Sequence, residues 1–149
     1  MTPTLTRHTV RVNGIRMHVA EAGKGPPVVL LHGYPETWYA WRNQWPNLAR
    51  DYHVIMPDLR GYGDSDKPDS GYDKRTMAED VRQLVAHFGY DRISLIGHDR
   101  GARVATRFAK DHRQMVDRKR SKTIASTSFA CNSPRRRLVK PSCRWQDST

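Results

Sequence analysis

The stretch SLIGHDRGARVATRF, residues 94–108, predicts a strand that turns sharply into a helix. Gly97 and Gly101 stand two residues on either side of Asp99, which is the spacing of a nucleophile elbow. In such a turn the strand and helix backbones nearly touch, and the central residue is pushed outward with strained backbone angles. Asp99 is therefore a candidate nucleophile. The alternative is that Asp99 only caps the helix that follows.

A second loop is predicted to face the same point. The apolar run Val28 to Leu31 indicates a strand covered on both faces, and HGYP, residues 32–35, follows it directly. A loop in that position can aim a backbone N–H at the same place as the N–H of the residue after Asp99. We predict that the N–H groups of Tyr34 and Arg100 form an oxyanion hole. The supporting residues are expected to be His32, Gly33, Pro35, Gly97, His98 and Gly101, with both histidines shaping their turns rather than titrating.

The remaining pattern predicts an α/β fold. Asn13-Gly14 suits a two-residue turn between alternating runs, which indicates an N-terminal β-hairpin. Further strands are expected over 52–57 and 92–97, and helices over 37–51, 76–90 and 101–112. This order of β-α-β-α-β-α favours a mostly parallel sheet with helices on both faces.

Finer expectations concern the helices and the loop between 59 and 73. The stripe Trp38, Trp41, Trp45 is expected to be core, with Pro46 kinking or splitting the C-terminal half of its helix. Thr76 is the expected N-cap of the next helix, which Gly89 ends. Arg60 or Asp64 is expected to hold the loop in shape.

Charge divides the chain into two parts. The net charge is +11, yet residues 1–118 hold 18 Lys and Arg against 14 Asp and Glu, while residues 119–149 hold 8 against 1. We therefore expect a single core over 1–118 and a basic, Ser/Arg/Pro-rich, largely disordered tail over 119–149, with no strand after Arg118. The alternative function for this tail is contact with anionic partners in a non-catalytic chain.

Composition excludes several kinds of site. Cys131 and Cys143 lack the paired spacing of a metal or redox centre, so no metal and no cofactor are expected. No apolar run approaches the roughly 20 residues of a membrane span, so a cytoplasmic protein without membrane contact is expected. Neither nucleic-acid binding nor a defined oligomeric state is indicated. The expected partner is a small-molecule substrate.

Three motifs together resemble a known family. LLHGYPETWYAW (30–41), VIMPDLRGYGDSDKP (54–68) and LIGHDRGARVA (95–105) are similar to the N-terminal half of α/β-hydrolase-fold enzymes with an aspartate nucleophile. That branch includes epoxide hydrolases, haloalkane dehalogenases and haloacetate dehalogenases. The resemblance covers about residues 8–118 and implies a truncated α/β-hydrolase fold.

Within this branch, Arg100 and Arg103 resemble the pair that holds the substrate carboxylate in haloacetate (fluoroacetate) dehalogenases. The resemblance implies that Asp99 displaces halide from a small 2-haloacid through an aspartyl ester. Two guanidinium groups suit this task because each offers bidentate hydrogen bonds to a carboxylate. The alternatives are that the arginines are ordinary surface charges or neutralise Asp99, and that the substrate is an epoxide or an ester.

The family also uses groups that are not matched here. It completes its site with a later acid, a late histidine and a helical cap, whereas no histidine follows His112 and Asp147 is the only acid after Arg118. We expect the ester at Asp99 to persist, so that each molecule reacts at most once. The change after MVDR, residues 115–118, is typical of a shifted reading frame or a joined tail. The strand before Asp99 is expected to leave an apolar edge open.

Overall fold

The computed structural model describes residues 3–122, and the backbone alone from residue 118 onward. Both cysteines, Asp147 and nearly all of the predicted basic tail therefore lie outside the described residues. The division of the chain at Arg118 into core and tail stays a prediction. In the described range, no helix has both the length and the apolar character needed to cross a bilayer.

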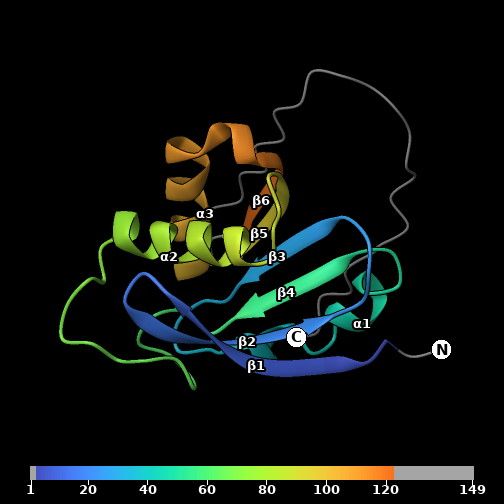
Figure 1. Cartoon of the computed structure of the whole chain (residues 1–149), viewed down its shortest axis with the longest axis horizontal. Helices are drawn as coiled ribbons and strands as arrows, with labels where there is room; N and C mark the ends of the chain where they lie inside the picture. The colour runs from blue at the N-terminus through green and yellow to red at the C-terminus, as the bar shows by residue number, and fades with distance from the viewer. Residues whose placement is uncertain (1–2, 123–149) are drawn as a thin grey trace.

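One six-stranded sheet organises the chain (Figure 1). Its strands, in spatial order, are β1 (Leu5–Val12), β2 (Ile15–Ala22), β4 (His53–Pro57), β3 (Pro27–Leu31), β5 (Ile93–His98) and β6 (Val116–Lys122). The first two pair antiparallel through the Asn13-Gly14 turn, and β4, β3, β5 and β6 run parallel. The predicted hairpin and mostly parallel sheet are confirmed.

Helices cover both faces of this sheet. Figure 1 shows α2 (Lys74–His87) and α3 (Arg100–Asp111) together on one face, where their apolar sides join the larger core cluster. On the other face lie the 3₁₀ helix η1 (Trp38–Trp41) and the short α1 (Trp45–Leu48). The 3₁₀ turn η2 (Arg113–Met115) leads into β6. Because α2 and α3 both follow parallel strands, their N-termini point to the carboxyl edge of the sheet.

Three local predictions are corrected. The expected helix over 37–51 is two separate helical turns, η1 and α1. Pro46 lies in the first turn of α1, which begins at Trp45, instead of kinking or splitting the C-terminal half of a longer helix. The tryptophan stripe still packs on the core, as predicted. The N-cap of α2 is Asp73, whose carboxylate accepts the N–H groups of Arg75 and Thr76, so Thr76 lies inside the helix.

The third correction concerns the edge of the sheet. No strand was expected after Arg118, yet β6 continues to Lys122 and pairs with β5 in parallel, from Ile93 opposite Val116 to His98 opposite Lys122. The strand was not predicted because KRSK, residues 119–122, lacks the apolar residues typical of a buried strand. Backbone pairing to β5 does not require apolar side chains. The apolar strand β5 is therefore interior to the sheet rather than its open edge.

A buried polar network ties the hairpin to α2. Arg60 donates from Nε and Nη2 to the two carboxylate oxygens of Asp80 at 2.9 and 2.7 Å, and from Nη2 to the Asn13 carbonyl at 3.2 Å. Asn13 Nδ2 donates to Asp80 Oδ1 at 2.7 Å. Arg60 thus holds the loop after β4 in place, as predicted.

Candidate active site

Asp99 occupies the turn between β5 and α3 in a strained conformation. Its φ is +46° and its ψ is −112°, a region that costs a non-glycine residue about 1–3 kcal/mol. Its side chain makes no capping hydrogen bond to α3, so the alternative that Asp99 merely caps this helix is wrong. The Asp99 carboxylate instead accepts a hydrogen bond from the loop that follows β3.

Gly97 and Gly101 make this turn possible. A Cβ on Gly97 would lie 2.6 Å from the Gly101 carbonyl oxygen, and a Cβ on Gly101 would run into the Leu31 carbonyl oxygen. Real Cβ atoms do not approach backbone this closely. The glycine spacing therefore reflects direct contact among β3, β5 and α3.

His32 holds the loop after β3. Its ring is fully buried, with Nδ1 2.9 Å from the Gly33 carbonyl and Nε2 accepting the Leu59 N–H at 2.9 Å. Burial lowers the pKa of His32, so the ring is neutral at pH 7 with its proton on Nδ1. His32 joins the loops after β3 and β4, which is the shaping role predicted for it.

The Tyr34 N–H points at Asp99. It donates to Asp99 Oδ2 at 3.0 Å, and Pro35 follows through a cis peptide bond. Gly33 allows this approach because a Cβ there would lie 2.8 Å from the Asp99 Cβ. The Gly33 N–H itself donates to Glu36 Oε2 at 2.9 Å. The structure thus brings the HGYP loop to Asp99, and the oxyanion-hole role of these N–H groups stays a prediction.

The surroundings of Asp99 favour its charged form. The Tyr34 N–H lowers the pKa of Asp99 most; the nearby Arg100 N–H and the charges of His98 and Arg103 lower it further, against the opposing effect of burial. Asp99 is consequently an anion at neutral pH. An anionic carboxylate is the form that can act as a nucleophile.

The two arginines do not neutralise Asp99. Within residues 3–122, neither Arg100 nor Arg103 forms an ion pair with this carboxylate within 4.0 Å. The Arg100 guanidinium carbon instead lies 5.5 Å from the centre of the Tyr34 ring. Arg103 is exposed on the first turn of α3. Both cations remain available to a ligand.

Sequence reasoning missed two residues near the arginines. Lys74, the first residue of α2, has its pKa lowered by burial and by the charges of Arg100 and Arg103. Burial raises the pKa of Tyr62, and the charge of Arg100 opposes this rise. For Lys74 a usable signal existed, because a helix following a parallel strand begins at the carboxyl edge where Asp99 lies.

No histidine among residues 3–122 hydrogen-bonds to Asp99. His98, the neighbour of Asp99, has Nε2 4.0 Å from Glu36 Oε2. His18 pairs with Asp58 at 2.9 Å, but both are buried away from solvent. Within residues 3–122, the candidate nucleophile Asp99 therefore has no hydrogen-bonded histidine that could activate water.

One group of side chains has the composition of a metal site. His18, Asp58 and Asp64 each offer a ligand atom, all within 4.8 Å of one another. Asp58, however, already accepts N–H bonds from Trp38 at 2.7 Å and from Asp64 at 3.1 Å, besides its contact with His18. These contacts make Asp58 a connector of three segments.

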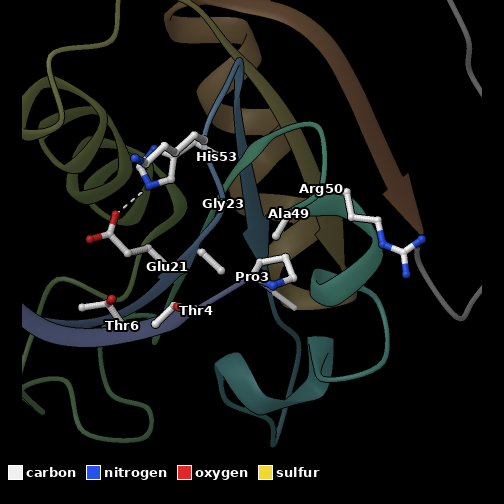
Figure 2. A pocket seen from close by; sticks show the side chains of 10 residues that line it. Pro3, Thr4, Thr6, Glu21, Gly23, Ala49, Arg50 and His53 are labelled. Carbon is white, nitrogen blue, oxygen red and sulfur yellow. Dashed lines mark hydrogen bonds and ion pairs between the residues drawn. The ribbon is translucent and has the colours of Figure 1, made fainter. Parts of the chain in front are cut away.

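A cavity lies away from Asp99. It has a volume of about 560 Å³ and is lined by residues such as Pro3, Glu21, Arg50 and His53 (Figure 2). His53 Nε2 lies 2.6 Å from Glu21 Oε2, so the polar groups of its wall already bind each other. Because β4 begins at His53, this cavity is at the opposite edge of the sheet from Asp99. It does not belong to the candidate site.

Known proteins share this arrangement. The family model described as alpha/beta hydrolase fold matches residues 26–133. The chain is 57% identical over 118 residues to the soluble epoxide hydrolase of Corynebacterium sp. (strain C12), covering 79% of this chain and 41% of that protein. It is 41% identical over 115 residues to the fluoroacetate dehalogenase of Burkholderia sp., covering 74% of this chain and 38% of that protein.

Solved structures agree with these matches. The epoxide hydrolase CorEH without ligand matches with a TM-score of 0.80 and 53% identity, covering 85% of this chain and 47% of that chain. The present chain spans about two fifths of the length of the curated relatives it matches. Two of the three kinds of hydrolase named from the motifs, epoxide hydrolases and haloacetate dehalogenases, are among the relatives. The predicted α/β-hydrolase fold is confirmed, and the substrate stays a prediction.

Proposed function

We propose, for a chain that belongs to the alpha/beta hydrolase fold family, that Asp99 is a nucleophile which attacks a saturated carbon. The observation that carries this proposal is the Asp99 carboxylate itself. It is ionised, strained outward and bound by the Tyr34 N–H at 3.0 Å, yet unpaired with the adjacent arginines in the described part of the chain. A carboxylate kept free of counter-ions at such a turn suits covalent catalysis.

The proposed step forms one bond and breaks another. An Asp99 carboxylate oxygen attacks the carbon, a carbon–oxygen ester bond forms, and the leaving group departs with the bonding electrons. From an epoxide the leaving group is the ring oxygen, which stays attached to the adduct and takes a proton from water. From a 2-haloacid it is halide. The product in both cases is an ester on Asp99.

Epoxides are the first candidate substrates. The matched proteins include the soluble epoxide hydrolase of Corynebacterium sp. at 57% identity and the epoxide hydrolase CorEH at 53%. These identities exceed the 41% to the fluoroacetate dehalogenase of Burkholderia sp.. This comparison supports an epoxide more than the sequence motifs alone did.

Small 2-haloacids are the second candidate, because of the unpaired cations. Arg100, Arg103 and Lys74 lie close enough for the arginine charges to lower the pKa of Lys74. Such a cluster favours a substrate that carries its own negative charge. The fluoroacetate dehalogenase among the relatives supports the same substrate class.

Covalent labelling tests the proposal. The full 149-residue chain is incubated with 1,2-epoxybutane or with chloroacetate, and the adduct is located by peptide mass spectrometry. We expect one equivalent of ester on Asp99, with the mass of the whole epoxide or of a carboxymethyl group. Asp99→Asn should remove the adduct and Asp111→Asn should retain it. Labelling confined to other residues would contradict the proposal.

The same experiment measures turnover. Because no histidine hydrogen-bonds to Asp99 in residues 3–122, we propose that the ester accumulates rather than being hydrolysed. Halide release should then stop at one equivalent per chain. Continuous release would contradict this part of the proposal and leave the role of Asp99 intact.

A further inference from the structure

We propose that the side chain of Tyr34 is a positioning residue that holds the Arg100 guanidinium where it can bind a negatively charged substrate beside Asp99. This inference rests on the proposed function of Asp99 and deepens it, because it names a side chain that selects among substrates. The sequence pointed to Tyr34 only for its backbone N–H. Its ring is a second group with a contact of its own.

The Tyr34 ring contacts the Arg100 guanidinium. The Arg100 Cζ lies over this ring, 5.5 Å from its centre, which is within the range of a cation–π interaction. Within residues 3–122, Arg100 forms no ion pair with the carboxylate of Asp99, although the two residues are adjacent in the chain. In this part of the chain the cation is therefore placed by an aromatic ring and not by the neighbouring acid.

Two further contacts fix Tyr34 itself. Its backbone N–H donates to Asp99 Oδ2 at 3.0 Å. Its ring meets the Tyr62 ring edge to face, with centres 6.5 Å apart and planes at 81°. The Tyr62 ring in turn meets the ring of buried His32 edge to face at 5.2 Å and packs against the larger core cluster. Although Tyr34 is 65% exposed, its ring is thus connected to the core through aromatic contacts.

Tyr34 therefore links the nucleophile to the cation. Its backbone binds the Asp99 carboxylate and its ring binds the Arg100 guanidinium, so one residue determines how these two groups are placed relative to each other. In a 2-haloacid the carboxylate is bonded to the carbon that Asp99 attacks, so the substrate must meet both groups at once. Restricting a flexible arginine before the substrate arrives lowers the entropy lost on binding.

The contact also keeps the two opposite charges available. A guanidinium bound to the Asp99 carboxylate would occupy the nucleophile and use the hydrogen-bond donors of Arg100. A cation–π interaction depends on the charge above the ring face and does not require an acceptor for those donors. Arg100 held by Tyr34 can therefore still bind a substrate carboxylate.

The test compares two reagents that differ in charge. Chloroacetate carries a carboxylate, whereas 2-chloroacetamide has a similar shape and no charge. The ratio of their rates of Asp99 alkylation measures recognition of the negative charge, and any damage that slows both reagents equally cancels from it. Tyr34→Leu, which keeps the backbone N–H and removes the ring, should lower this ratio about two- to fivefold, the effect of losing a cation–π interaction at an exposed site.

Conservative replacements show whether the ring face is responsible. Tyr34→Phe retains an aromatic face without the hydroxyl, so it should restore most of the ratio that Tyr34→Leu loses. Phenylalanines with increasing numbers of fluorine atoms at this position weaken the negative potential of the face while nearly keeping its size. The ratio should fall stepwise along this series. A fall in Tyr34→Phe as large as in Tyr34→Leu would overturn the role of the ring face.

A double-mutant cycle separates positioning from a structural role. If Tyr34 acts through Arg100, Tyr34→Leu should leave the ratio unchanged in an Arg100→Gln background. Tyr39→Leu is the matched control, because the Arg42 Cζ lies over the Tyr39 ring at 5.1 Å in the same kind of contact. We expect this control to retain the ratio of the unsubstituted chain.

Each remaining result has a defined meaning. An unchanged ratio in Tyr34→Leu, or an equal fall of the ratio with and without Arg100, would overturn the positioning role while Asp99 stands as the nucleophile. If the unsubstituted chain forms no Asp99 adduct with either reagent, the proposed function is overturned, and the role of Tyr34 with it.

Discussion

Two aspartates follow strands of the same parallel sheet and are used in opposite ways. Asp58 comes directly after β4, is 1% exposed and is bound by His18 and by the N–H groups of Trp38 and Asp64. Asp99 comes directly after β5, is half-buried and accepts one N–H, from Tyr34. The comparison shows that position at the carboxyl edge does not make a carboxylate reactive. Within residues 3–122, both carboxylate oxygens of Asp58 accept hydrogen bonds, whereas only Oδ2 of Asp99 does so.

The largest expected effect tests the free carboxylate. Asp99→Asn should slow alkylation by at least about 1,000-fold, since removing a nucleophile removes the reaction path itself. The free energy of unfolding should change little, because asparagine tolerates the same backbone angles. The measurements are adduct formation by mass spectrometry and urea unfolding. A variant that still reacts at the elbow would contradict the assignment.

Substitution of Asp58 should lower stability and leave the reactivity of Asp99 in place. Asp58→Ala leaves buried His18 and the part-buried N–H groups of Trp38 and Asp64 without their acceptor, so we expect a loss of about 3 kcal/mol in the free energy of unfolding. Alkylation per folded molecule should persist. Urea unfolding measures the loss, with exposed Asp69→Ala as the control. Equal stability of the two variants would show that Asp58 is not a structural connector.

The pH dependence of alkylation tests how the Asp99 carboxylate is bound. Because the Tyr34 N–H lowers the pKa of Asp99 below its ordinary 3.8, the carboxylate should remain ionised as the pH falls through that value. Its contribution to stability is therefore present above 3.8 and is lost as the pH falls through the lower, folded pKa. Alkylation by 2-chloroacetamide, whose charge is constant, should follow the same curve, about tenfold per pH unit below the pKa. A midpoint above 3.8 would contradict the role of the Tyr34 N–H.

The smallest expected effect concerns Lys74, which is near enough to Arg100 and Arg103 for their charges to lower its pKa. Lys74→Gln should slow alkylation by chloroacetate about two- to fivefold and leave 2-chloroacetamide unaffected, since a partly solvated charge acts weakly. Added salt should reduce the difference. Lys110→Gln, which removes a charge from the last turn of α3, is the matched control. Equal effects of the two substitutions would assign the change to net charge alone.

The sequence predicted the elbow well because geometry constrains it strongly. Gly97, Gly101 and Gly33 are the residues at which a side chain would strike backbone or Asp99. Such positions require glycine, so they can be recognised in the sequence. The apolar strands were predicted for a similar reason, since burial restricts their composition.

Contacts between residues that are distant in the sequence could not be predicted from it. The cap of α2 was misplaced because Asp73 and Thr76 are both good caps, and only the observed bonds choose between them. Strand β6 was missed because KRSK is basic and polar, and backbone pairing with β5 does not require apolar side chains. Tyr62 was not singled out because the effect of Arg100 on it depends on the tertiary fold: the two residues are 38 positions apart in the sequence.

The network of Arg60, Asp80 and Asn13 affects the order in which parts of the chain can fold during synthesis. Its members come from the hairpin turn, the loop after β4 and helix α2, so they are far apart in the sequence. During synthesis, the hairpin leaves the ribosome before residue 80, so the side-chain contacts of its turn can form only after α2 has been made. Until then the Asn13 carbonyl and amide depend on water. The hairpin is therefore made well before the contacts that secure its turn.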